Sequence, residues 1–172
     1  MRKTKSTPRE LLPLDYIRLD SPIGDLHLFA TEHELVRIDF RAPPKSVTKL
    51  ASATTKNPVL RKARTQLKEY FAGRRTQFDL PLALMGTPFQ MRVWKELTRI
   101  PYGKTISYGE QAKRVGAGKA YRAVGTANGR NPIPIVIPCH RVIAGDGGLG
   151  GYGGGLGVKT KLLRLETSVK DS

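Results

Sequence analysis

The residue types best suited to chemistry gather in one short stretch, "IVIPCHRVI" at residues 135–143, which holds the only cysteine of the chain. Cys139 follows a proline and directly precedes His140. A thiol reacts as its thiolate, which a neighbouring base and an acid that orients the base help to form. Because successive residues of a strand point to opposite faces, His140 can reach Cys139 only at a bend or through a water. Composition alone favours the alternative, a small buried cysteine among isoleucines and valines.

Two reactions suit such a thiol: acyl transfer, as in a cysteine peptidase, and displacement at an alkyl carbon. The charge of the chain bears on the choice, because its 172 residues carry a formal charge of +16 and a pI near 10.3. Residues 1–84 hold 16 Lys and Arg against 9 Asp and Glu, and residues 85–172 hold 14 against 5, so no single basic tail explains the excess. Such a charge predicts a polyanionic partner, most often nucleic acid, although a generic basic surface is the plainer alternative.

Composition disfavours several other classes of protein. Apolar residues make up 39%, no apolar run approaches the ~20 residues of a membrane span, and the N-terminus lacks the apolar core of a secretory signal. One cysteine cannot form an internal disulfide, and neither CxxC nor a paired His and Cys spacing offers a zinc site. We therefore expect a soluble protein of the cytoplasm, or of the nucleus in a eukaryote.

The first half of the chain shows strand periodicity followed by one helix. Three short alternating segments are typical of an antiparallel meander. They lie at residues 16–20, 25–31 and 35–40. Residues 41–57 predict a loop or a weak helix. Asn57 as N-cap and Pro58 in the first turn then start a helix that Gly73 ends.

The second half is richer in helix patterns. Residues 78–86 predict an edge strand or a linker, after which Thr87 and Gln90 form a capping-box pattern with a proline at the first helical position. The buried face of the helix that follows is predicted to comprise Phe89, Val93, Trp94, Leu97 and Ile100. The change of pattern predicts two small domains, residues 1–84 and residues 85–172.

Two short helices in this basic half, at residues 107–116 and 121–129, predict a helix-turn-helix. The first opens with the capping-box pattern "SYGE". An ordinary helical hairpin fits the pattern equally well. The second helix is almost bare, because small residues leave Arg122 as its main long cationic side chain, and such a helix can approach a narrow groove closely. The small residues are Ala120, Ala123, Gly125 and Ala127.

Residues 145–157 are too rich in glycine for a helix or a strand and predict a loop that approaches other groups closely. Gly145, Gly147 and Gly150 match the GxGxxG pattern of dinucleotide sites. We reject that interpretation because the chain ends before a βαβ unit is complete. A final helix is predicted from residue 158 to near Glu166.

Taken together, these motifs resemble one family, the O6-alkylguanine-DNA alkyltransferases (methylated-DNA-protein-cysteine methyltransferases). The similarity rests on "PCHRVI", on the preceding "YRAVGTANGRNPIPIVI" and on the following "KLLRLE". It extends through "GTPFQMRVWKELTRIPYGKTISYGEQA", and "SPIGDLHL" and "LKEYFAG" support it in the N-terminal half. The resemblance implies an α/β (α+β) fold: a small ribonuclease-H-like N-terminal domain and a C-terminal winged-helix-like domain that carries the helix-turn-helix.

The resemblance also implies DNA repair by direct reversal of damage. The thiolate of Cys139 would attack the alkyl carbon on O6 of guanine, keep the alkyl group irreversibly and release intact guanine, so each molecule acts once. O4-alkylthymine is a further candidate substrate. His140 would be the base, acting through a water, with Glu166 orienting its imidazole. Asn131 would help to hold the site through hydrogen bonds.

The DNA contacts follow from the same resemblance. Arg122 matches an arginine that enters through the minor groove and fills the space left when the target nucleotide flips out. The small residues Ala120, Ala123 and Ala127 would let the helix enter a groove ~6 Å wide. Tyr108 matches a tyrosine that crowds the adjacent phosphate and can donate a proton to the departing guanine.

The implied substrate pocket comprises Tyr152, Gly153, Val142 and Met85. Tyr152 would line the base, and backbone groups of Val142 and Cys139 would bind the guanine edge. Gly153 stands where some relatives have serine, and the glycines that follow it are expected to admit larger alkyl groups.

The expected partner is double-stranded DNA with an O6-alkylguanine lesion, bound by a monomer without metal, cofactor or membrane. Cooperative assembly along DNA is left open. Two other functions compete with this one. A helix-turn-helix regulator with an inert cysteine would bind DNA sequence-selectively and gain no alkyl group. A cysteine hydrolase would turn over repeatedly and would give Arg122 no role.

Overall fold

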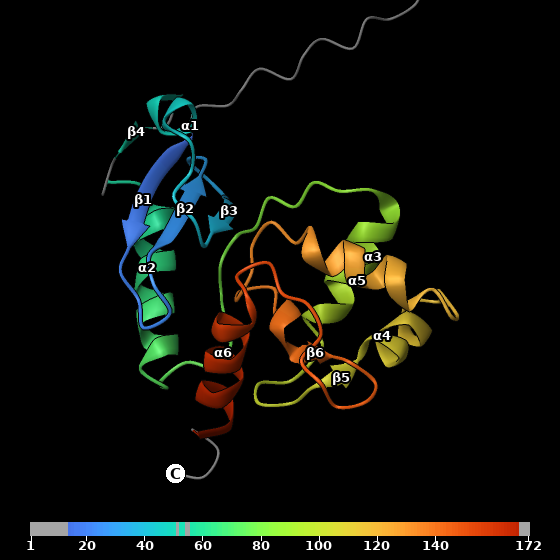
Figure 1. Cartoon of the computed structure of the whole chain (residues 1–172). Coiled ribbons are helices and arrows are strands. Elements are labelled where there is room, and N and C mark those ends of the chain that lie inside the picture. The colour runs from blue at the N-terminus through green and yellow to red at the C-terminus, as the bar shows by residue number, and fades with distance from the viewer. Residues whose placement is uncertain (1–13, 51, 54–55, 169–172) are drawn as a thin grey trace, which may run out of the picture.

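The structure is a computed structural model that describes residues 14–50, 52–53 and 56–168, and it is a mixed α/β protein, as the sequence predicts (Figure 1). Four strands form the N-terminal sheet in the order β3-β2-β1-β4. Their bounds are β1 (Asp15–Leu19), β2 (Leu26–Ala30), β3 (Leu35–Asp39) and β4 (Ser52–Ala53). The antiparallel meander is confirmed, because β2 pairs antiparallel with both β1 and β3.

The loop or weak helix predicted for residues 41–57 contains two short elements. Helix α1 (Lys45–Leu50) is followed by β4, which pairs in parallel with β1. No pattern in the sequence indicates β4, because a two-residue strand is too short to show alternation.

Helix α2 (Pro58–Phe71) forms as predicted. The Asn57 side chain accepts a hydrogen bond from Leu60 N at 3.0 Å and so satisfies one of the free N–H groups of the first turn. The helix packs against β1 and β2. Its buried apolar side chains are Val59, Leu60, Ala63, Leu67 and Tyr70.

Residues 78–86 form a linker rather than a regular strand. One isolated bridge joins Leu82 to Leu35 of β3. Leu35 N donates to Pro81 O at 2.8 Å and Leu35 O accepts from Ala83 N at 2.9 Å, so the linker is fastened to the edge of the sheet.

The C-terminal half is mainly helical. Its elements are α3 (Pro88–Leu97), β5 (Ile106–Ser107), α4 (Tyr108–Arg114), α5 (Tyr121–Gly129), the short 3-10 helix η1 (Cys139–Arg141), β6 (Val142–Ile143) and α6 (Leu156–Ser168). Helix α5 packs against α3 and α4, and β5 pairs in parallel with β6. Both capping-box hydrogen bonds of α3 form between Thr87 and Gln90.

The predicted capping box of α4 is only half formed. Ser107 Oγ accepts from Glu110 N at 3.0 Å, but the Glu110 carboxylate pairs with Arg114 one turn along the helix instead of returning to the N-cap. An arginine four residues downstream competes successfully for this side chain.

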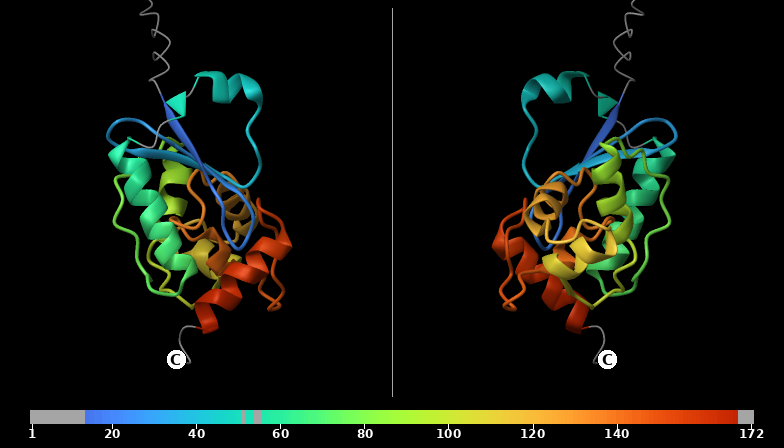
Figure 2. Two further views of the ribbon diagram at one scale, coloured as in Figure 1. Left: turned by 90° about the vertical axis from the view of Figure 1, so that its left-hand side faces the viewer. Right: turned by 90° about the vertical axis from the view of Figure 1, so that its right-hand side faces the viewer.

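In the view of Figure 1, helix α6 lies between α2 and the group formed by α3, α4 and α5, and Figure 2 shows it at the lower side of the molecule. It is two residues longer than predicted at each end, so Glu166 lies inside its last turn. No helix of the described part of the chain has both the length and the apolar composition needed to cross a bilayer.

Candidate active site

A sharp turn presents Cys139. Ile135 adopts a φ of 75°, in the left-handed region that β-branched residues rarely enter, so the chain reverses direction just before the cysteine. Asn131 holds this turn, because its Nδ2 donates to Ile137 O at 2.7 Å and its Oδ1 accepts from Ile133 N at 3.0 Å. Cys139 then begins η1, so it and its neighbour are not on opposite faces of a strand.

His140 and Glu166 form a buried pair. The distance between His140 Nε2 and Glu166 Oε1 is 2.6 Å, and neither side chain is exposed. Burial alone would raise the pKa of Glu166, but hydrogen bonds and charges from His140 and Arg141 lower it to about 2. The carboxylate is therefore ionised and can only accept, so Nε2 of His140 carries the ring proton and Nδ1 is a free acceptor.

Glu166 receives an unusual number of donors for a single carboxylate. Besides His140, they are Tyr70 Oη at 2.8 Å, Arg141 Nε and Nη2 at 2.9 Å each, and Gly103 N at 3.1 Å. Arg141 also donates to Ile100 O at 2.7 Å. A buried charge is costly unless it is paired and hydrogen-bonded, and here both conditions are met.

The two groups that would exchange a proton are neutral at rest. Burial raises the pKa of the Cys139 thiol, partly offset by Asn131 and by the charge of Lys159. Burial also lowers the pKa of His140, although Glu166 opposes that shift. A reaction at Cys139 therefore needs a base, and His140 Nδ1 is a buried acceptor with no hydrogen-bond partner among the described residues.

Lys159 of α6 is a site residue that the sequence analysis missed. Its side chain is buried, and Nζ donates to Val142 O at 2.7 Å, to Gly151 O at 3.3 Å and to Leu149 O. The cation thus fastens the glycine-rich loop to the strand that follows Cys139. Nothing in "VKTKLLRLE" separates this lysine from the exposed Lys161, since only the fold decides which of them points inward.

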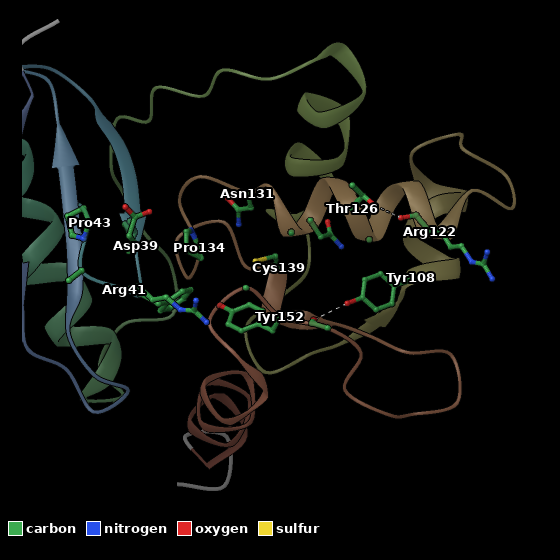
Figure 3. Close-up of a pocket in the computed structure, with 18 of the residues that line it drawn as sticks. Asp39, Arg41, Pro43, Tyr108, Arg122, Thr126, Asn131, Pro134, Cys139 and Tyr152 are labelled. Carbon is green, nitrogen blue, oxygen red and sulfur yellow. Dashed lines mark hydrogen bonds between the residues drawn. The ribbon is translucent and has the colours of Figure 1, made fainter. Parts of the chain in front are cut away.

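A cavity of about 880 Å³ opens beside Cys139 (Figure 3). From the C-terminal half it is lined by Tyr108, α5, Asn131, Pro134, Cys139 and residues 151–153. The opposite wall is residues 38–44 of the N-terminal half, which the sequence analysis did not assign to the site. A volume of this order holds a nucleobase with a substituent.

Phe40 joins that N-terminal wall to the glycine-rich loop. Its ring lies 5.7 Å from the Tyr152 ring, centroid to centroid, and a Cβ added at Gly154 would lie 2.9 Å from its Cδ2. A side chain at residue 154 would therefore displace the ring. Burial and the neighbouring Cys139 raise the pKa of Tyr152 well above its usual value, so its hydroxyl keeps its proton.

Tyr108 lies at the mouth of the cavity, against the other end of the same loop. Its hydroxyl donates to Gly151 O at 3.3 Å. Gly150 has a φ of +68°, and a Cβ there would lie 2.8 Å from Tyr108 Cε2, so both backbone conformation and space require glycine. Burial, and then the charge of a Cys139 thiolate, raise the pKa of Tyr108, so it remains a proton donor.

Helix α5 presents a bare surface, as predicted, with one correction. Arg122, Ala120 and Ala123 are exposed, and Arg122 extends away from Cys139 (Figure 3). Ala127, which was expected on the DNA-binding face, is buried, and its carbonyl accepts from Trp94 Nε1 at 2.9 Å. Residue 127 lies three residues after the buried Val124 and shares its core-facing stripe, whereas Ala120 and Ala123 lie at the N-terminal end of the helix, where this side is exposed.

Two predicted pocket residues do not line the cavity. Met85 is 69% exposed and lies in the linker before α3, away from the cavity lining. Val142 is fully buried, and its backbone is already engaged: N–H donates to Cys139 O and the carbonyl accepts from Lys159. Gly153 and Tyr152 do line the cavity. Within the described residues no cluster of three or more His, Cys, Asp or Glu side chains is arranged to hold a metal ion.

Comparison with known proteins gives matches over nearly the whole chain. Residues 14–84 match the family described as "6-O-methylguanine DNA methyltransferase, ribonuclease-like domain", and residues 88–168 match "6-O-methylguanine DNA methyltransferase, DNA binding domain". A methylated-DNA--protein-cysteine methyltransferase of Methanosarcina barkeri is 48% identical, covering 88% of this chain and 96% of its own. One from Mycobacterium bovis is 49% identical, covering 90% and 93%.

Solved structures are similar over the same length. The crystal structure of the Mycobacterium tuberculosis O6-methylguanine methyltransferase is 48% identical, covers 90% of this chain and 93% of its own, and superposes with a TM-score of 0.82. A structure of the M. tuberculosis protein in complex with DNA gives a TM-score of 0.81 at 48% identity, covering 90% and 94%.

Proposed function

The chain belongs to the 6-O-methylguanine DNA methyltransferase family, and on that premise we propose how its residues carry out the reaction. It repairs DNA by moving an alkyl group from O6 of guanine to the sulfur of Cys139. The observation that supports this most directly is the position of Cys139, the only thiol, in the cavity lining beside the buried His140–Glu166 pair.

The chemical step is a displacement at the alkyl carbon. The Cys139 proton passes through a water to His140 Nδ1, and Glu166 stabilises the imidazolium. The thiolate then forms a C–S bond as the C–O6 bond breaks, and the electron pair of that bond goes to guanine. Tyr108 donates a proton to the guanine ring and regains one from the medium, to which the His140 imidazolium releases the proton that it took from the thiol.

Access to the lesion requires the nucleotide to leave the duplex. Helix α5, with Ala120, Ala123 and Gly125 on its open side, enters the minor groove, and Arg122 fills the vacated stack. The cavity beside Cys139 takes the flipped base, which stacks against Tyr152. Because the product thioether is stable, each monomer repairs one lesion.

The test is the intact mass of the protein after incubation with a duplex that contains one O6-methylguanine. We expect the wild type to gain one methyl group and no more, whereas Cys139→Ala and wild type with undamaged duplex gain none. Tight lesion-dependent binding without any gain in mass would contradict transfer and would indicate a protein that only senses the lesion.

A further inference from the structure

The N-terminal domain reaches the His140–Glu166 pair through one side chain. Tyr70 lies in the last turn of α2 and is fully buried, and its Oη donates to Glu166 Oε1 at 2.8 Å. This is the oxygen that His140 Nε2 contacts at 2.6 Å. The lower ends of α2 and α6 approach each other where this contact forms (Figures 1 and 2).

We propose that Tyr70 is a positioning residue for alkyl transfer, through which the N-terminal domain sets the orientation and the basicity of the Glu166–His140 pair. The inference rests on the proposed role of His140 as the base. Tyr70 touches neither the alkyl group nor the thiol, so it acts entirely through the carboxylate.

The physical basis is competition for one oxygen. Oε1 of Glu166 accepts from Tyr70, His140 and Arg141. Each donor stabilises the negative charge and makes the carboxylate a weaker partner for a protonated imidazole. Without the Tyr70 hydroxyl, Arg141 and Gly103 still pair the carboxylate. Its remaining charge is then shared among fewer donors, so the imidazolium of His140 becomes more stable.

The other charged groups around His140 come from the C-terminal half. Glu166 raises its pKa, whereas Arg141 of η1 and Lys159 of α6 lower it. Tyr102 lies in the same cluster, with its ring 6.1 Å from that of Tyr70 and 5.6 Å from the Arg141 guanidinium. The Tyr102 hydroxyl has no hydrogen-bond partner among the described residues, so Tyr102→Phe removes the same atom without removing a donor to Glu166.

The experiment compares full-length Tyr70→Phe, Tyr102→Phe and wild type. Single-turnover methyl transfer and an NMR titration of the His140 ring would both be followed from about pH 5 to 8.5. For Tyr70→Phe we expect the His140 midpoint and the acid limb of the transfer rate to move up together by about 0.5 to 1 pH unit. Tyr102→Phe should coincide with wild type. A Tyr70→Phe titration that superimposes on the wild-type curve would overturn the proposal.

A second variant covers the case in which Tyr70→Phe fails to fold. Fluorotyrosine at position 70 keeps the size of the ring and makes the hydroxyl a stronger donor, so the His140 midpoint should move down. No movement, or movement upward, would also overturn the proposal. The NMR titration does not depend on transfer, so a wild type that never gains a methyl group would refute the proposed function separately.

Discussion

The two sides of Cys139 are built in opposite ways. On one side, His140, Glu166 and Arg141 are buried, and all five hydrogen bonds to the carboxylate come from fixed donors. On the other side the cavity is open and is walled by glycines, small residues of α5 and a segment of the N-terminal half. We refer to these as the proton side and the DNA side.

The difference follows from what each side has to do. A proton passes along hydrogen bonds between fixed groups, so the proton side benefits from rigid packing that keeps each hydrogen bond in place. A flipped nucleotide must enter and leave, which requires space and a backbone that DNA can approach closely. Changes on the proton side should therefore alter transfer and stability, whereas changes on the DNA side should alter recognition.

The largest effect is expected from Glu166→Gln. A neutral amide cannot stabilise the His140 imidazolium, so transfer should slow by about 100-fold or more, within the range that general-base catalysis contributes. It also leaves the buried Arg141 charge without its partner, which should lower the free energy of unfolding by about 3 kcal/mol. Single-turnover rates and urea unfolding measure the two losses.

Binding to a lesion-containing duplex is the control for Glu166→Gln. The folded variant should bind with nearly wild-type affinity, since Glu166 lies outside the cavity lining. A loss of DNA affinity as large as the loss of rate would mean that the proton side and the DNA side are not separate.

Arg122→Ala should impair recognition of the lesion in duplex DNA and leave stability unchanged, the reverse of what we expect for Glu166→Gln. We expect transfer on duplex DNA to fall by about 10-fold, because the flipped state loses a group that fills the stack and flipping costs roughly a few kcal/mol. Unfolding should be unchanged, since Arg122 is exposed. On a single-stranded oligonucleotide with the same lesion the variant should approach the wild-type rate. Arg130→Ala, an exposed arginine at the end of α5 outside the cavity lining, is the matched control.

The DNA side was more visible in the sequence than the proton side. The bare α5, the exposed Arg122 and the glycine-rich loop follow from residue types alone, because small residues and glycine mark close approach wherever the fold places them. Periodicity also predicted the meander, α2 and α3. Ala127 was placed wrongly on the DNA-binding face, because its spacing from Ala120 and Ala123 matches one side of the helix, and only the N-terminal end of that side is exposed.

The proton side depends on contacts over long sequence distances. Tyr70 and Glu166 are separated by 96 residues, and Arg141 and Glu166 by 25. No local sequence feature distinguishes Lys159 from an exposed helical lysine. The wall formed by residues 38–44 reaches the cavity only because the two halves of the chain pack together. Met85 was misplaced for the same reason, since it lies in a linker whose path the sequence does not define.

Gly154→Ala tests whether the N-terminal wall of the DNA side is a tight contact. The added Cβ would meet the Phe40 ring at 2.9 Å, whereas one at Gly153 would meet nothing within 4 Å. Overpacking of this kind costs about 1–3 kcal/mol, so Gly154→Ala should unfold at lower urea than Gly153→Ala and transfer a methyl group a few times more slowly than wild type. Equal urea midpoints for Gly154→Ala and Gly153→Ala would show that Phe40 can move aside freely.

The smallest expected effect is the response to pH, which also tests whether the proton side and the DNA side act separately. Burial lowers the His140 pKa below its ordinary 6.5, so the imidazole stays neutral and able to accept the thiol proton down to that pH. Transfer should therefore change little from pH 8 to 6.5 and fall only below it, as the ring becomes protonated before the thiol can deliver its proton. Binding through α5 does not use the His140 imidazole, so affinity for a lesion duplex, measured by anisotropy on Cys139→Ala at constant ionic strength, should not follow the same curve. A transfer midpoint above 6.5 would contradict the lowered pKa of His140, and an affinity that falls in parallel with the rate would place a titrating group on the DNA side.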